Sequence, residues 1–249
     1  MESPGSFLRQ LRRQLLAFVL SSSRRLNLSP IVKYTALTFF ADRFLPSLER
    51  YKLDSRARNW LLQPLTESNL QLFVLVSVWI ASKIHDTRPL SVKSLKTFAD
   101  DIIQDQHFTT RDIVDAELVF MKRLFQVLRF DIGAMNITVI FLEELLSQFK
   151  EVAKAGDIMS ISSCMDIMDL LYETEEMSKL YKYPHSLAVS VLVASYVMGV
   201  PAQRSEFPLL PWVKLTTSYK EEDIAEIVRS ILEHVLEPTM KARGFEKAG

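Results

Sequence analysis

The sequence predicts an all-α fold, and three observations support this prediction. Apolar residues recur at helical spacing along nearly the whole chain. Glycine is scarce, with 6 in 249 residues, whereas strand-rich folds need glycine in their turns. Two runs, residues 72–81 and 183–199, are almost uninterrupted stretches of apolar residues, which is typical of a helix covered on all sides by other helices.

The first half of the chain predicts five main helices. The first covers residues 7–20, and the second starts at Ser29 and Pro30, with serine as N-cap and proline in the first turn. We expect this second helix to reach about Leu45, with Pro46 at its end or just beyond it. Residues 50–68 are polar and predict a loop that contains a short helix. The remaining helices are expected over residues 69–83, 89–103 and 109–129.

The second half repeats this order, which indicates two related subdomains. Helices are predicted over residues 136–154, 160–177, 183–199 and 219–236, with a proline-bearing loop over residues 201–217. The two apolar helices are about 115 residues apart. The pattern predicts two stacked helical subdomains of about five helices each, each wrapped around an apolar central helix.

Charge and cysteine content limit the classes of function and the compartment. Lysine plus arginine equals aspartate plus glutamate, 30 each, so the neutral chain argues against nucleic acid as a partner. The single cysteine, Cys164, excludes a disulfide within the chain and fits a reducing compartment. No secretory signal begins the sequence, and the run at 72–81 is shorter than the roughly 18 residues of a membrane span. We therefore expect a nuclear or cytoplasmic protein, neither secreted nor membrane-bound.

The sequence shows no catalytic constellation. No two glycines are close enough to form a phosphate-binding loop, and no G-x-S-x-G motif is present. Cys164 lies in a predicted helix face and is expected to be a buried structural thiol. The histidines are scattered and pair with no second metal ligand: His85, His107, His185 and His234. Neither a cofactor nor a metal is expected, and the function indicated is protein binding, not catalysis.

Four segments, in this order, resemble the cyclin family. They are "YTALTFFADRFLPSL" at 34–48, "LQLFVLVSVWIASK" followed by "DTRPLSVKSLKTFADD", "LFQVLRFDIGAMNITVIFLEELL", and "KYPHSLAVSVLVASY". The resemblance covers roughly residues 11–236 and is closest to the short plant J-type cyclins. It implies an N-terminal cyclin box at 7–131 with an insertion at about 49–68, a C-terminal cyclin-like repeat at 135–237, and a short tail at 238–249.

The resemblance also implies a function. A cyclin is a non-catalytic subunit that binds and activates a cyclin-dependent serine/threonine kinase, in cell-cycle or developmental control. It stabilises the arrangement in which the αC helix of the kinase forms its lysine–glutamate pair. Substrate or inhibitor proteins are possible further partners. Two alternatives stay open: a cyclin-fold transcription adaptor, and a degenerate cyclin that binds a kinase without activating it.

The resemblance places one residue pair at the kinase interface. In cyclins the lysine of "ASK" lies there with a glutamate from a later helix, and Lys83 matches this lysine. Counted back from Phe130 and Asp131, the glutamate position falls on Met121, whereas Glu117 lies one helical turn earlier. Glu117 either replaces the family glutamate or the contact is lost. Without the resemblance, Lys83 is a helix C-terminal lysine favoured by the macrodipole.

Two further segments each have two interpretations. Leu11, Leu15 and Phe18 of the first predicted helix, together with Gln71, correspond to a substrate-docking patch of some cyclins; alternatively, this stretch is an ordinary amphipathic first helix. In the insertion, Trp60 with its two following leucines either packs back onto the first repeat or forms an exposed anchor for a partner.

Overall fold

The computed structural model describes the chain except for residues 1–3, 52–58, 129–136, 154–158, 201–206 and 247–249; side chains at 4–10, 49–51, 125–128 and 237–246 are also excluded. The described residues form helices and turns without a strand, which confirms the all-α prediction. Internal contacts divide the chain into two compact units, Met1–Asn136 and Ile137–Gly249. The junction between the helices expected at 109–129 and 136–154, the middle of the insertion and the end of the tail lie outside the described residues.

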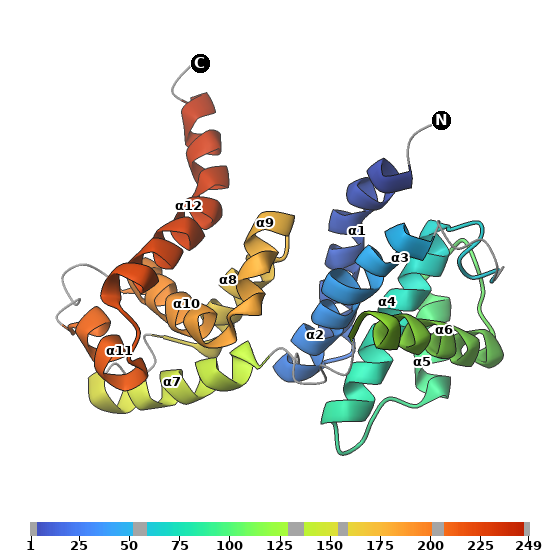
Figure 1. Ribbon diagram of the computed structural model, residues 1–249, viewed down its shortest axis with the longest axis horizontal. Helices are drawn as coiled ribbons and strands as arrows, with labels where there is room; N and C mark the ends of the chain where they lie inside the picture. Colours follow the sequence, from blue (N-terminus) through green and yellow to red (C-terminus); the bar gives the residue numbers. More distant parts are fainter. Residues whose placement is uncertain (1–3, 52–58, 129–136, 154–158, 201–206, 247–249) are drawn as a thin grey trace. The chain divides into compact units, whose positions relative to one another are not determined.

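The first unit is built around α4 (Figure 1). Every residue from 72 to 82 is buried, as the apolar composition of this run predicts. α4 packs against α1, α2, α5, α6 and a π-helix. The elements of this unit are α1 (Pro4–Arg25), α2 (Pro30–Leu37), the π-helix (Thr38–Phe44), α3 (Leu45–Tyr51), α4 (Glu67–His85), α5 (Val92–Ile102) and α6 (Thr110–Leu128).

The second unit is built around α10, the other apolar run (Figure 1). Residues 187–196 are all buried, and α10 packs against α7, α8, α11 and α12. The elements are α7 (Thr138–Ala153), α8 (Ile161–Leu171), α9 (Glu175–Ser178), a 3₁₀ helix (Lys179–Lys182), α10 (Pro184–Gly199), α11 (Leu209–Thr217) and α12 (Glu221–Glu246).

An aromatic cluster joins three elements of the first unit. Phe44 of the π-helix lies with its ring centroid 4.5 Å from those of both Phe73 on α4 and Phe120 on α6. Phe40 continues the cluster, with its centroid 6.0 Å from that of Phe44. All four rings are fully buried. The cluster therefore fixes α4 and α6 against the same neighbour, and these two helices bear the candidate site.

The helix expected over residues 30–45 continues past Pro46, so the prediction that this proline ends it is wrong. The backbone widens into the π-helix at Thr38–Phe44, and α3 then begins at Leu45. Leu45 donates its backbone N–H to the carbonyl of Phe40, a π-type hydrogen bond. Pro46 then lies in the first turn of α3, where its missing N–H breaks no hydrogen bond within that helix.

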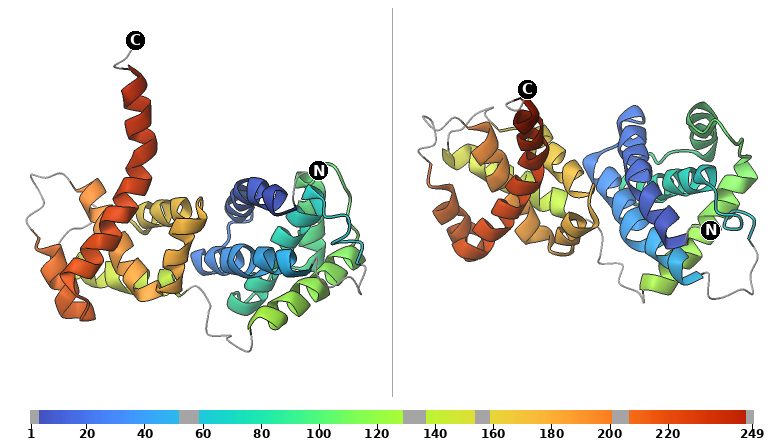
Figure 2. Two further views of the ribbon diagram at one scale, coloured as in Figure 1. Left: turned by 45° about the horizontal axis from the view of Figure 1, so that its top comes forward. Right: turned by 90° about the horizontal axis from the view of Figure 1, so that it is seen from above.

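Three other boundaries differ from the expectation. The loop expected at 201–217 contains α11, because Pro208 and Pro211 lie before and within its first turn, where proline is tolerated. The helix expected at 160–177 ends at Leu171, and α9 restarts after Thr174, whose hydroxyl accepts from the N–H of Met177. α12 continues beyond the expected end at Leu236 to Glu246, and it projects past the other helices of its unit (Figure 2).

Candidate protein-binding site

The structure brings Lys83 and Glu117 together. Lys83 lies in the last turn of α4 and Glu117 in the middle of α6, two helices that pack against each other. The Nζ of Lys83 is 2.6 Å from Oε1 of Glu117, a charge-assisted hydrogen bond. The side chains are 38% and 22% exposed, so a partner can reach both. The contact is therefore present within the chain, while the role of Glu117 in place of the family glutamate at a kinase interface stays a prediction.

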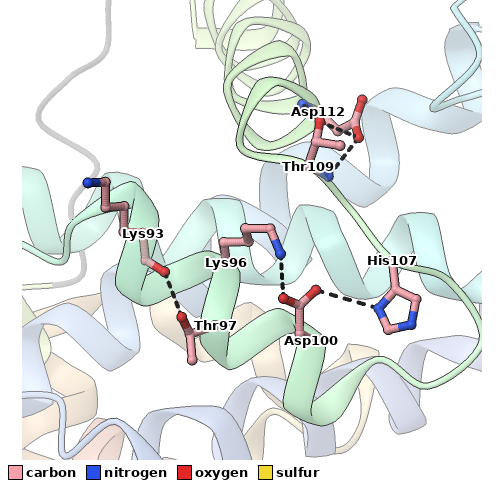
Figure 3. A network of polar contacts seen from close by, with 7 residues as sticks. All are labelled: Lys93, Lys96, Thr97, Asp100, His107, Thr109 and Asp112. Atoms are coloured by element: carbon pink, nitrogen blue, oxygen red, sulfur yellow. Dashed lines mark hydrogen bonds and ion pairs between the residues drawn. The ribbon is translucent and has the colours of Figure 1, made fainter.

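The start of α6 sets the register of Glu117. Thr109 and Asp112 form a reciprocal cap: the Thr109 hydroxyl accepts from the N–H of Asp112 at 3.2 Å, and Oδ2 of Asp112 accepts from the N–H of Thr109 at 2.8 Å (Figure 3). The negative charge of Asp112 also favours the N-terminus of the helix. The helix therefore begins at Thr110, and Glu117 follows two turns later on the face toward α4.

A second polar contact connects α5 to the segment that leads into α6. Asp100 of α5 accepts a 2.5 Å hydrogen bond from Lys96 and lies 3.6 Å from Nδ1 of His107 (Figure 3). The hydrogen bond from Lys96 is the main cause that lowers the pKa of the Asp100 carboxyl, with His107 contributing in the same direction. His107 precedes the cap at Thr109, so α5 and the start of α6 are linked by side chains as well as by the chain.

Trp79 supports Lys83 from the preceding turn of α4. The ammonium of Lys83 lies 3.4 Å from the centroid of the Trp79 ring, a cation–π contact between residues four apart on the helix. The indole N–H donates to the carbonyl of Leu90 at 2.8 Å. Sequence reasoning did not single out Trp79, although its position four residues before Lys83 was visible.

On both helices, exposed apolar side chains lie close in sequence to the ion-pair residues. Ile84 follows Lys83 on α4 and is 46% exposed; on α6, Val114 and Leu118 are 41% and 56% exposed. Val114, Glu117, Leu118 and Met121 are spaced as neighbours on one face of a helix. Exposed apolar side chains on one helix face are a feature of protein-binding surfaces. In the sequence, this surface could have been found from the apolar residues at helical spacing around Glu117.

The candidate docking residues, three on α1 and Gln71 on α4, are largely withdrawn from solvent. Leu11 and Leu15 are buried at 7% and 1% exposure, whereas Phe18 and Gln71 are half-buried. Gln71 donates from Nε2 to Oε1 of Glu67 at 3.2 Å. The burial of the two leucines is what the amphipathic interpretation of this helix expects, and α1 packs against α4. Docking at these four residues stays a prediction.

In the described end of the insertion, the two leucines are packed into the first unit and Trp60 is exposed. Leu61 and Leu62 are buried, at 0% and 6% exposure, and pack into the first unit. Trp60 is 49% exposed. The side chain of Asn59 accepts from the N–H of Leu61 at 2.9 Å, which closes a turn in front of α4. The leucines thus fix the segment, while half of the tryptophan faces solvent.

His85, at the end of α4, gives the first unit a pH-dependent element. Its Nε2 lies 2.9 Å from the Thr35 hydroxyl on α2, and burial lowers the pKa of His85 below its usual 6.5, although Asp86 acts in the opposite direction. As the pH falls below 6.5, the unfolded chain binds this proton before the folded chain does. Protonation at His85 therefore destabilises the fold from pH 6.5 down to the lowered pKa of the folded state.

We expect His85→Gln to reduce the loss of stability on acidification. Glutamine keeps a polar group for Thr35 and does not titrate. Melting temperatures at pH 7.5 and 5.0 should differ less for the variant than for the parent chain. The other histidines are common to both proteins and cancel in this comparison. An equal loss of stability in the two proteins would contradict the prediction.

The structure offers no sign of chemistry at the remaining candidates. Cys164 is fully buried, as expected, and desolvation raises the pKa of its thiol. Among the described residues, no three histidine, cysteine or acidic side chains are arranged to hold a metal ion. Within that same part of the chain, no helix has the length and apolar character needed to cross a membrane.

Comparison with known proteins identifies the family. The cyclin N-terminal domain family matches residues 2–133, more than half of the chain. The chain is a cyclin. A Cyclin-J18-like protein of Oryza sativa subsp. japonica is 56% identical over 240 residues, covering 94% of this cyclin and 90% of the relative. Cyclin-J18 of Arabidopsis thaliana is 55% identical over 226 residues, covering 91% of this cyclin and 95% of the relative.

Proposed function

We propose that this cyclin binds and activates a cyclin-dependent serine/threonine kinase through the surface formed by the C-terminal end of α4 and the middle of α6. The observation that supports this proposal is the 2.6 Å pair between Lys83 and Glu117. The family implies a lysine–glutamate pair at the kinase interface, and this chain forms one although its glutamate lies one turn from the family position. The protein acts where such kinases are found, in the nucleus or the cytoplasm.

The surface suits this role because its groups are held on rigid elements. α4 is buried from Leu72 to Ser82, and the aromatic cluster fixes it to the π-helix and α6. A partner that meets an ordered surface loses less free energy on binding than one that must order it. By binding better to the kinase in which αC is in place, the cyclin shifts the kinase population toward that arrangement.

A binding and phosphotransfer assay tests the proposal. The full chain, tagged and immobilised, is incubated with a panel of cyclin-dependent kinases, and any complex is assayed on a generic serine/threonine substrate. We expect one or more kinases to bind and to gain activity over the kinase alone. If no kinase binds, the proposal fails and a cyclin-fold transcription adaptor becomes the better hypothesis, with Trp60 as the first surface to test.

One observation favours a second candidate function. Glu117 lies one helical turn from the family position, which is occupied by Met121. A kinase that contacts this shifted pair would meet the cyclin in a displaced pose, which favours binding without full activation. Binding in the assay without a gain of phosphotransfer would support this degenerate cyclin. The patch at Leu11, Leu15, Phe18 and Gln71 remains a proposed docking site for substrate or inhibitor proteins.

A further inference from the structure

Trp79 contacts both the Lys83 side chain and the backbone of the segment between α4 and α5. One face of its indole lies against the Lys83 ammonium, 3.4 Å from Nζ to the ring centroid. The indole Nε1 donates to the carbonyl of Leu90, in the segment between α4 and α5, at 2.8 Å. The side chain is only 6% exposed, so the ring is confined by packing as well as by this hydrogen bond.

The acceptor of that hydrogen bond is itself held in place. The N–H of Leu90 donates to the Ser82 hydroxyl at 2.9 Å, and this hydroxyl donates to Oδ2 of Asp86 at 2.9 Å. The Leu90 side chain packs on the buried cluster of Val32, Ala36, Val78 and Ala81. Rotation of the indole would break its bond to a fixed carbonyl. The plane on which Lys83 rests is therefore set by the α4–α5 segment.

We propose that Trp79 is the positioning residue of the kinase-binding surface: it holds Lys83 against Glu117 before any partner arrives. This inference rests on the proposed function, because it assigns Lys83 to the kinase interface. Lysine has a long side chain that loses rotamer freedom when a partner immobilises it. Ordering one such side chain at an interface weakens binding by about two- to tenfold, and Trp79 removes this loss by ordering Lys83 in the free protein.

The position of Trp79 on the helix explains why it can act in this way. Residues four apart are neighbours on a helix surface, and long side chains in helices point back toward the N-terminus. Lys83 therefore extends over the turn that contains Trp79, and its ammonium reaches both the ring and the carboxylate of Glu117. An aliphatic residue at position 79 would keep the apolar packing but would give the ammonium no attractive face.

The first test uses the free chain and needs no kinase. A methylene group above an indole ring is shifted upfield in a proton NMR spectrum by the ring current. In chain labelled with ¹³C at lysine ε-carbons, we expect one resonance, assigned by its loss in Lys83→Met, to be shifted upfield. The shift should vanish in Trp79→Leu and persist in part in Trp79→Phe, which keeps an aromatic face but lacks the N–H. A Lys83 resonance without the shift would overturn the proposal.

The second test measures affinity for the kinase found by the panel assay. Trp79→Leu should weaken binding by about two- to tenfold, and Trp79→Phe should restore most of the loss. In a Lys83→Met background, Trp79→Leu should have no further effect, because the side chain to be positioned is absent. Trp212→Leu, in the second unit, is the control for loss of a tryptophan. Urea unfolding of each variant confirms that it is folded during the titration.

The outcomes separate this inference from the proposed function. If Lys83→Met weakens binding and Trp79→Leu does not, the positioning role is overturned and the kinase site stands. If Trp79→Leu weakens binding equally with and without Lys83, its effect is structural and the inference is also overturned. If Lys83→Met leaves affinity unchanged while the NMR shift is present, the kinase site is wrong, and the role of Trp79 in binding is wrong with it.

Discussion

Lys83→Glu is expected to weaken the complex with the kinase by at least about 30-fold while the chain stays folded. Removing one partner of a hydrogen-bonded charge pair that becomes buried at an interface typically costs 2–5 kcal/mol of binding free energy. In the free protein the same pair is partly exposed, and pairs of that kind contribute at most about 1 kcal/mol to folding stability. Binding and stability should therefore respond very differently to this substitution.

Calorimetric titration against the kinase, with urea unfolding in parallel, checks this prediction. Lys214→Glu is the matched control, because Lys214 forms a similar exposed pair with Glu221 in the second unit, 3.4 Å apart. Glu117→Ala should weaken binding by a factor close to that of Lys83→Glu. Should Lys83→Glu instead unfold the chain, or leave the affinity at the level of the Lys214 control, the pair is structural and the kinase assignment fails.

Phe44→Ala is expected to destabilise the first unit by about 3–5 kcal/mol, the usual cost of truncating a buried phenylalanine. The ring is fully buried and lies 4.5 Å from both Phe73 and Phe120, measured between centroids. Its removal leaves a cavity between the π-helix, α4 and α6. A domain is typically stable by only about 5–15 kcal/mol, so this loss is a large part of the total.

Thermal and urea unfolding of the full chain measure this effect. The melting temperature of the first unit should fall by roughly 10–20 °C. Phe149→Ala provides the control, because Phe149 is equally buried in the second unit, where it contacts Tyr196, Phe207 and Trp212. A loss below about 1 kcal/mol for Phe44→Ala would show that the aromatic cluster does not fix α4 to α6.

The fold class could be predicted from the sequence because the two apolar runs are too short to span a membrane and are best buried as central helices. Residues 72–82 and 187–196 are buried on every side, as their composition required. Helix ends were less predictable, because a proline can follow one helix or open the next, and Pro46 and Pro211 open theirs. The π-helix at Thr38–Phe44 had no sequence signal. The ring packing of Phe40 and Phe44 that occurs with it is a tertiary contact, which the sequence pattern does not reveal.

The sequence predicted the residues of the candidate site but not their contact. Lys83 was found from its motif, and Glu117 from helical spacing, but counting along the chain could not decide whether the two side chains meet. That question depends on the register between α4 and α6, which is set by the cap at Thr109 and by the packing of Phe120 on α6 against Phe44 of the distant π-helix. Trp79 was missed because its apolar character alone suited the core.

The pairing of Lys83 with Glu117 also bears on how fast a partner finds this surface. The two charges cancel at the site, and the whole chain has a formal net charge of zero. A surface without net charge does not attract a partner over long distances, so encounters occur at the ordinary rate of about 10⁵–10⁶ M⁻¹s⁻¹ and change little with added salt. Under the proposed function, discrimination between kinases then depends on how long each complex lasts once it has formed.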